Sequence, residues 1–152
     1  MLNLYEELVS VISALEAAGI EYALCGGLAM AVWSHPRATV DIDLLIEHES
    51  VETVERIAAS LGYAFKARPM SFSAGIVQIR RVSKADPDGG DVLMLDLLLV
   101  TEPLVKVWES RTRVVWDRGA LSVVSREGLI TLKKLRSSGI DMEDIRKLEE
   151  GL

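Results

Sequence analysis

Two apolar segments with aspartates at their centres constrain the fold of this chain most strongly. In residues 39–46, TVDIDLLI, apolar side chains alternate with a second set of side chains that includes Asp41 and Asp43. This period of two predicts a β-strand with one apolar face and one face that carries the acids. Residues 92–100, VLMLDLLLV, are apolar on both sides of Asp96, which predicts a second, largely buried strand. Aspartate has a poor strand propensity and is costly to bury, so these three positions require an explanation.

The composition indicates one soluble domain. The chain has 152 residues, of which 49% are hydrophobic, enough to form a core. Its net charge of -6 argues against a broad hold on nucleic acid, which needs a basic surface. The single cysteine, Cys25, excludes an internal disulfide, and we expect it to be a small buried hydrophobic residue. No signal peptide or membrane-spanning run is found, so we expect a cytoplasmic protein with no membrane partner.

The remaining patterns predict a mixed β-sheet backed by helices, an α+β (α/β-like) domain. Apolar periodicity and capping residues predict helices over residues 4–18, 28–35, 51–61, 126–135 and 141–150. Strands are expected over residues 21–27, 39–46, 75–82, 92–100, 113–116 and 121–124, with a turn over residues 83–91. Helices and strands alternate only in the first half, which favours a mixed sheet. We expect a single domain over residues 1–152, with a core over 1–124 and a helical segment over 125–152.

The three aspartates predict a metal site. Two strand residues that are two positions apart lie about 6.5–7 Å from each other, so Asp41 and Asp43 can share one cation. If the two acid-bearing strands are neighbours, Asp96 joins the same face. The alternative is that the acids are simply solvated on an exposed face of the sheet, but the apolar surroundings of Asp96 disfavour it. Carboxylate oxygens suit Mg²⁺ or Mn²⁺.

A glycine pair, Gly26 and Gly27, follows the first predicted strand and opens a helix. Glycine allows a ligand to approach the backbone closely, and a helix N-terminus favours phosphate. Alone, the pair is as readily explained by a tight turn, and no Walker lysine or GxGxxG pattern accompanies it.

Together, these residues resemble the signature of the DNA polymerase beta-type nucleotidyltransferases. In that family an apolar residue and Gly-Gly or Gly-Ser precede a spacer and then Asp-apolar-Asp-apolar. Here Cys25, Gly26 and Gly27 precede a 13-residue spacer and the segment from Asp41 to Leu44. The family also has a third acid between apolar residues on a later strand, and Asp96 matches it.

Within this superfamily the chain looks most like the small bacterial abortive-infection type, which includes nucleotidyltransferase toxins. These tend to show Arg-x-Thr-x-Asp-x-Asp, as residues 37–43 do, and a C-terminal lysine helix followed by Asp-x-x-Asp. Lys133, Asp141 and Asp144 fit that arrangement. Relatives usually have an arginine just before the last motif, where this chain has Ser138, so the role of the C-terminal segment is left open.

The resemblance implies an enzyme that moves an NMP from an NTP, such as ATP, to an acceptor hydroxyl of a protein or a tRNA, with release of pyrophosphate. Asp41, Asp43 and Asp96 would be the catalytic and metal-ligating residues for Mg²⁺ or Mn²⁺, with Asp96 helping to deprotonate the hydroxyl. Gly26, Gly27 and Lys133 would bind the nucleotide, although Lys133 could equally be a solvated helix residue.

Two other classes of function stay in view. The chain could be a non-catalytic relative that binds an NTP or a cognate partner protein in a toxin–antitoxin pair, or a structural domain with a vestigial acid cluster. Retention of all three acids favours the enzyme. A basic cluster of Arg80, Arg81 and Lys84 is expected beside the site, where it either touches a nucleic-acid acceptor or only solubilises the end of a strand.

Overall fold

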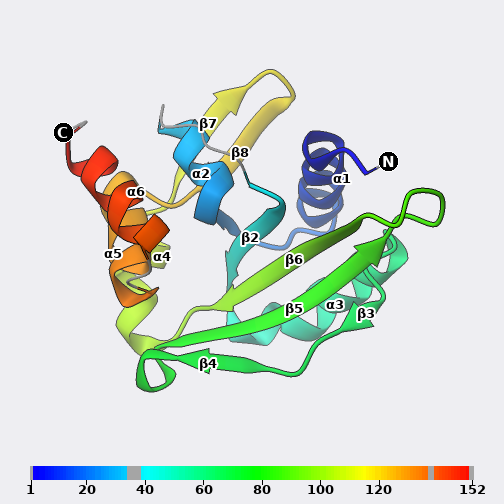
Figure 1. Ribbon diagram of the computed structural model, residues 1–152, viewed down its shortest axis with the longest axis horizontal. Helices are drawn as coiled ribbons and strands as arrows, with labels where there is room; N and C mark the ends of the chain where they lie inside the picture. The colour runs from blue at the N-terminus through cyan, green and yellow to red at the C-terminus, as the bar shows by residue number, and fades with distance from the viewer. Residues whose placement is uncertain (1, 34–38, 137–138, 151–152) are drawn as a thin grey trace.

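The computed structural model describes residues 2–33, 39–136 and 139–150, and it has an open mixed sheet of eight strands with helices packed around it (Figure 1). The strands are β1 (Ala23–Cys25), β2 (Asp41–Ile46), β3 (Phe65–Lys66), β4 (Met70–Phe72), β5 (Val77–Ala85), β6 (Val92–Leu99), β7 (Thr112–Trp116) and β8 (Gly119–Val123). Their order is β3-β5-β6-β2-β1-β8-β7, and β4 pairs with β5 beside β3. The β2–β6 and β1–β8 pairs are parallel, and the other pairs are antiparallel. The predicted fold class is confirmed.

Six α-helices accompany the sheet within the described ranges. They are α1 (Leu4–Ala17), α2 (Gly26–Val32), α3 (Val51–Ser60), α4 (Val105–Glu109), α5 (Arg126–Arg136) and α6 (Gly139–Glu150). None of these helices combines the length and the apolar character that a membrane crossing requires.

Helix α1 lies over one face of the sheet, together with α3 (Figure 1). Its predicted apolar stripe is buried at Leu8, Val11, Ile12 and Leu15. Glu7 of α1 accepts hydrogen bonds from the Lys84 ammonium of β5, at 2.9 and 3.1 Å, and from the Tyr63 hydroxyl at 2.9 Å. Because side chains alternate along a strand, Arg81 of β5 points to the opposite face from Lys84. The predicted basic cluster is therefore split between the two faces of the sheet.

The opposite face of the sheet carries the acids. In the parallel pairing of β2 with β6, Asp43 lies directly beside Asp96, and Asp41 lies one pleat away on the same face. The intervening Ile42 points to the other side and is fully buried. The two acid-bearing strands are thus neighbours, which was the condition for Asp96 to join the face of Asp41 and Asp43.

Several element boundaries differ from those predicted. Helix α2 begins at Gly26 and ends at Val32, whereas a helix over 28–35 was predicted; residues 34–38, including Arg37, lie outside the described ones. Strand β5 continues to Ala85, so the predicted turn over 83–91 begins too early. Ser50 does not cap α3 with its side chain, but the Ser125 hydroxyl accepts a 2.9 Å hydrogen bond from the Gly128 amide at the start of α5, as predicted.

Three short elements were not predicted at all: β3, β4 and α4. Each has two to five residues, too few for a period of two or of 3.6 to be recognised. Strand β4 matters for function, because it forms part of the wall of the candidate site.

Candidate active site

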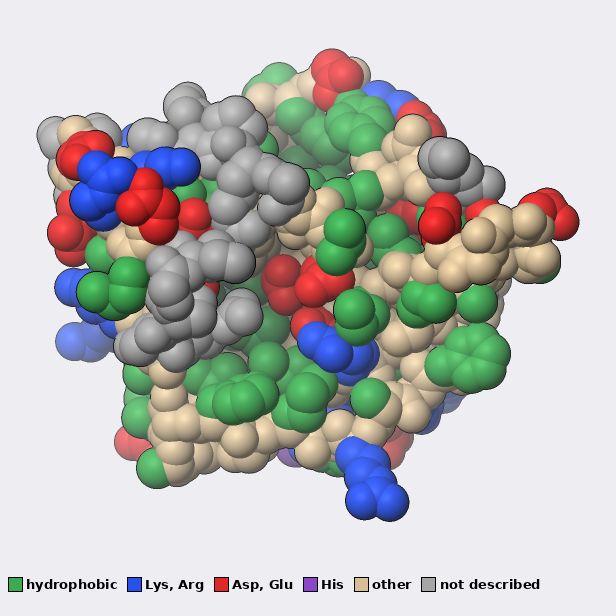
Figure 2. Space-filling model, viewed as in Figure 1, with side chains coloured by type: hydrophobic (Ala, Val, Ile, Leu, Met, Phe, Trp, Pro, Cys, Tyr) green, Lys and Arg blue, Asp and Glu red, His purple; other side chains and the backbone are tan. Residues whose placement is uncertain are grey.

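A cavity of about 600 Å³ opens on the acid-bearing face of the sheet. Figure 2 shows acidic and basic side chains meeting near the centre of this face, with hydrophobic side chains close by. The polar part of the wall includes Gly26, Gly27, Thr39, Asp41, Asp43, Arg81, Asp96, Lys133 and Asp141. The structure therefore brings all six sequence-predicted site residues to one cavity.

The three acids differ in their burial. Asp41 and Asp43 are half-buried, whereas Asp96 is only 4% exposed. The neighbours of Asp96 on its own strand, Leu95 and Leu97, are fully buried. The alternative of a solvated acidic face therefore does not hold for Asp96, whose charge must be stabilised by the protein or by a ligand.

Asp96 is bound by a forked arginine. The Arg81 guanidinium donates from Nε to Oδ1 of Asp96 at 2.7 Å and from Nη2 to Oδ2 at 2.9 Å. This bidentate geometry is the strongest form of the arginine–carboxylate pair. The hydrogen bonds to Asp96, and beyond them the charges of Asp41 and Asp43, hold the pKa of Arg81 above its ordinary value. Arg81 is thus a cation that the protein itself supplies to Asp96.

Sequence reasoning placed Arg81 near the site but missed this pairing, although the sequence contains a signal for it. In an antiparallel hairpin, partners are counted outward from the turn in equal steps, and here Ala85 faces Val92. The same count puts Arg81 opposite Asp96. Because the turn was placed three residues too early, the count could not be made.

The glycine pair closes tightly on the acids. Gly26 has a φ of +67°, and a Cβ atom there would lie 2.7 Å from Cγ of Asp43. Only glycine has both the left-handed conformation and the missing side chain that this position requires. Gly27, in the first turn of α2, is buried in the wall of the same cavity.

Lys133 is not a solvated helix residue. Its side chain is 3% exposed, and Nζ lies 2.9 Å from Oδ2 of Asp144 and 3.7 Å from Oδ1 of Asp141. Both carboxylates are also buried, and α5 and α6 are held together at this point. Lys134, by contrast, is 61% exposed. Lys133 therefore reaches the cavity wall as a member of a buried ion cluster.

Part of the cavity wall is apolar. It consists of side chains from β4, β5, β6 and α5: Met70, Phe72, Val77, Ile79, Leu98, Leu129, Leu132 and Leu135. The Ser73 hydroxyl donates a 2.6 Å hydrogen bond to the Leu135 carbonyl and so ties the end of β4 to α5. A flat apolar group bound here would have the acids at one end. No sequence motif predicted this apolar wall, because its residues come from four separate elements.

The donor set fits a divalent cation in its chemistry but is not a preformed three-ligand centre. Hard carboxylate oxygens of Asp41 and Asp43 face the cavity, as Mg²⁺ or Mn²⁺ would require. Within the described ranges, however, no three His, Cys, Asp or Glu side chains are arranged to hold a metal ion as they stand. The fork of Arg81 on Asp96 is one reason, since it engages both oxygens of that carboxylate.

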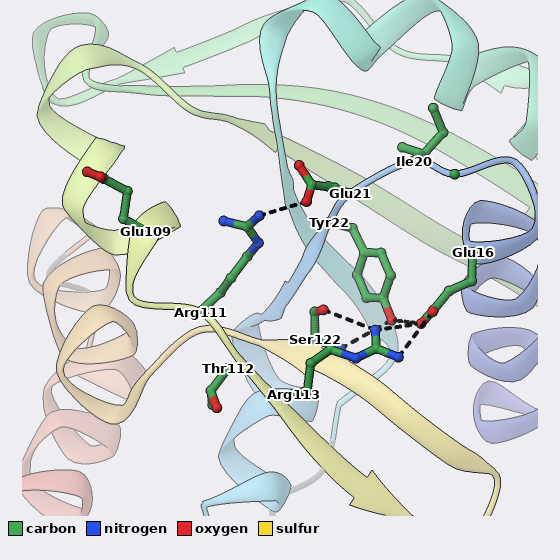
Figure 3. Close-up of a pocket in the computed structure, with 10 residues that line it drawn as sticks. Glu16, Ile20, Glu21, Tyr22, Glu109, Arg111, Thr112, Arg113 and Ser122 are labelled. Carbon is green, nitrogen blue, oxygen red and sulfur yellow. Dashed lines mark hydrogen bonds and ion pairs between the residues drawn. The ribbon is translucent and has the colours of Figure 1, made fainter.

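A second hollow, of about 530 Å³, lies at the other end of the sheet between α1, β7 and β8 (Figure 3). Its guanidinium groups are engaged by the protein: Arg113 by Glu16, at 2.9 and 3.1 Å, and Arg111 by Glu21, at 3.2 Å. The Tyr22 hydroxyl also donates to Glu16, and this bond together with burial raises the pKa of Tyr22 to about 12. None of the sequence-predicted site residues lines this hollow.

Comparison with protein families decides the class of the protein. Residues 11–115 match the model of the family described as nucleotidyl transferase AbiEii toxin, Type IV TA (toxin–antitoxin) system. The chain belongs to this family. The matched residues contain the glycine pair, the three acids and Arg81, but they end before α5, so the Lys133 cluster lies outside them. No curated protein matches the sequence significantly.

Solved structures show the same fold. A candidate nucleotidyltransferase from Thermotoga maritima superposes with a TM-score of 0.62 at 16% identity, over 97% of this chain and 93% of that one. The antibiotic-resistance enzyme ANT(2″)-Ia, in complex with adenylyl-2″-tobramycin, gives 0.59 at 16% identity, over 94% and 86%. The lincosamide antibiotic adenylyltransferase LnuA, bound to lincomycin, gives 0.57 at 14% identity, over 97% of both chains. The family and the fold agree that this chain is a nucleotidyltransferase.

Proposed function

We propose that this nucleotidyltransferase uses Mg²⁺ or Mn²⁺ to move an NMP from an NTP to an acceptor hydroxyl, and that it acts as the toxin of a toxin–antitoxin pair. The observation that carries the proposal is the β2–β6 register, which sets Asp43 beside Asp96 and Asp41 on the same face, next to the glycine pair. The family description supports the toxin role.

Each residue has a role in this proposal. The backbone at Gly26 and Gly27, at the start of α2, receives the triphosphate. Asp41 and Asp43 would hold the divalent cation, which would supply positive charge to the reacting phosphate oxygens. The acceptor hydroxyl gives its proton to Asp96 as its oxygen forms a bond to the α-phosphorus. The bond from that phosphorus to the bridging oxygen breaks, and pyrophosphate leaves.

Lys133 is proposed as a nucleotide-binding residue of the same cavity. Its place between Asp141 and Asp144 keeps the ammonium at the wall of the cavity that the nucleotide would occupy. The acceptor is proposed to be a protein or a tRNA hydroxyl, and the apolar wall beyond the acids supplies a surface for an apolar part of the nucleotide or of the acceptor.

Calorimetric titration tests the proposal. Each of the four NTPs is added, with and without Mg²⁺, to the wild type, to Asp43→Asn and to Asp91→Asn, which removes an exposed acid in the β5–β6 turn. We expect magnesium-dependent binding of at least one NTP that Asp43→Asn weakens by about 100-fold or more and that Asp91→Asn leaves unchanged. Pyrophosphate release in the presence of candidate acceptors then measures the transfer itself.

The same experiment separates the enzyme from its alternative. Magnesium-dependent binding without pyrophosphate release, in the presence of protein and tRNA fractions from a bacterial lysate, would favour a relative that binds an NTP or a partner without catalysis. Absence of NTP binding by the wild type under all conditions would refute the proposed transfer.

A further inference from the structure

The acid cluster of the candidate site contains its own counter-ion. Three carboxylates share one face of β2 and β6, and the Arg81 guanidinium is bound to one of them, Asp96. A free divalent cation thus meets a cluster whose charge and whose most buried carboxylate are already partly satisfied.

Arg81 is positioned for this role by the register of the sheet. It stands opposite Asp96 on the antiparallel neighbour β5, and the fork fixes both of its hydrogen bonds. The Arg81 side chain is 31% exposed in the cavity, whereas that of Asp96 is 6% exposed. Asp96 is therefore held in place by its strand, and the guanidinium, at the end of a long side chain, is the partner that can move.

We propose that Arg81 competes with the divalent cation for Asp96, so that the site binds the cation well only together with the nucleotide. This inference rests on the proposed function. While the site is empty, the guanidinium neutralises Asp96 and repels a free cation. When a triphosphate enters, its negative charge offers Arg81 a second partner, and Asp96 becomes available to the cation. Arg81 is a positioning residue in this scheme, since it acts through Asp96.

Titration of Mn²⁺ into metal-free protein, without nucleotide, tests the competition directly. Arg81→Gln removes the charge and the fork, so we expect the dissociation constant for Mn²⁺ to fall by about tenfold or more. Arg80→Gln is the matched control: it is the adjacent residue on β5, points to the other face, and removes the same charge. We expect Arg80→Gln to stay within about twofold of the wild type, since exposed charges act weakly at a distance.

A second titration measures the dissociation constant of an NTP in the presence of saturating Mg²⁺, and we expect Arg81→Gln to raise this constant. Loss of the guanidinium removes a phosphate partner, so Arg81→Gln should bind the magnesium-bound NTP about tenfold more weakly than the wild type does. A stronger hold on the free cation combined with a weaker hold on the nucleotide is a pair of effects that a merely structural arginine would not produce.

The possible results separate this inference from the proposed function. If no NTP binds but Arg81→Gln still tightens Mn²⁺ binding, the competition stands and the transferase proposal fails. If Mn²⁺ affinity in Arg81→Gln is unchanged, lower, or undetectable as in the wild type, the competition is refuted. Should Arg81→Gln fail to fold by circular dichroism, Arg81→Met decides: it also removes the charge and the fork, and an unchanged Mn²⁺ affinity there also refutes the inference.

Discussion

Two of the forked arginine–carboxylate pairs among the described residues lie in different environments. Arg81 and Asp96 pair at the candidate site at 2.7 and 2.9 Å, with Asp96 6% exposed. Arg113 and Glu16 pair at the second hollow at 2.9 and 3.1 Å, with Arg113 52% and Glu16 34% exposed. The geometry is nearly the same, so the difference lies in burial and in the neighbouring charges.

The two pairs differ in the acids that surround them. Around Glu16, the Tyr22 and Ser122 hydroxyls take part in the same hydrogen-bond network, and one carboxylate faces one guanidinium (Figure 3). Around Asp96, the carboxylates of Asp41 and Asp43 share the same sheet face. Carboxylates gathered around a buried pair in a cavity indicate a site built for a ligand, whereas an exposed pair indicates structure.

The largest expected effect on stability concerns the other buried charges of the candidate site. Lys133→Met removes the cation between Asp141 and Asp144, which are 2% and 1% exposed in their side chains. Removing one member of a buried ion cluster typically lowers the free energy of unfolding by about 3 kcal/mol or more. Urea unfolding measures this loss. Lys134→Met, one residue along α5 and 61% exposed, should cost less than about 0.5 kcal/mol.

If Lys133→Met and Lys134→Met lower the free energy of unfolding equally, burial does not decide how much a charged residue of α5 contributes to stability.

A smaller effect is expected at the glycine that touches the acids. Gly26→Ala combines a left-handed φ of +67° with overlap of the new Cβ and the Asp43 carboxylate, so we expect a loss of about 2–3 kcal/mol. Gly19→Ala is the control, because Gly19 has a φ of +70° and no atom within 4 Å of its Cβ position. There we expect only the conformational cost, about 1 kcal/mol. Thermal and urea unfolding of both variants isolate the contribution of the contact with Asp43.

If Gly26→Ala and Gly19→Ala lower the free energy of unfolding equally, the close approach of Gly26 to Asp43 does not contribute to stability. The glycine pair is then explained by a tight turn alone. If Gly26→Ala also weakens NTP binding while Gly19→Ala does not, the contact belongs to the site.

Much of the candidate site could be predicted from the sequence, and the features that could not be predicted were missed for physical reasons. The period of two in residues 39–46 located Asp41 and Asp43 on one face, because alternation is a property of the strand itself. The apolar surroundings of Asp96 indicated its burial. The pairing of Arg81 required the strand register, which depends on where the turn begins, and the predicted turn began three residues too early.

Other features of the site had no local signal. Phe72 lies on a three-residue strand and enters the cavity wall only because β4 pairs with β5. The burial of Lys133 depends on α6 packing against α5, and a lysine is usually exposed, so the sequence left its role undecided. Likewise, the two arginines of the second hollow meet their glutamates across more than 80 residues of sequence.

The smallest expected effect is at the exposed pair, and its pH dependence gives the sharpest check. The hydrogen bond from Arg113 is the main cause that lowers the pKa of Glu16 below its ordinary value of 4.5. A carboxyl whose pKa is lower in the folded state stabilises the fold above its unfolded pKa, and this stabilisation is lost as the pH falls through the folded pKa. Arg113→Gln should therefore lower stability by less than about 1 kcal/mol at pH 7 and progressively less below about pH 4.5, until the two proteins converge. Urea unfolding at a series of pH values measures the difference. A loss above about 2 kcal/mol at pH 7 would mean that the exposed Arg113–Glu16 pair contributes as much as a buried ion pair does. Burial would then not explain a difference between this pair and the Arg81–Asp96 pair.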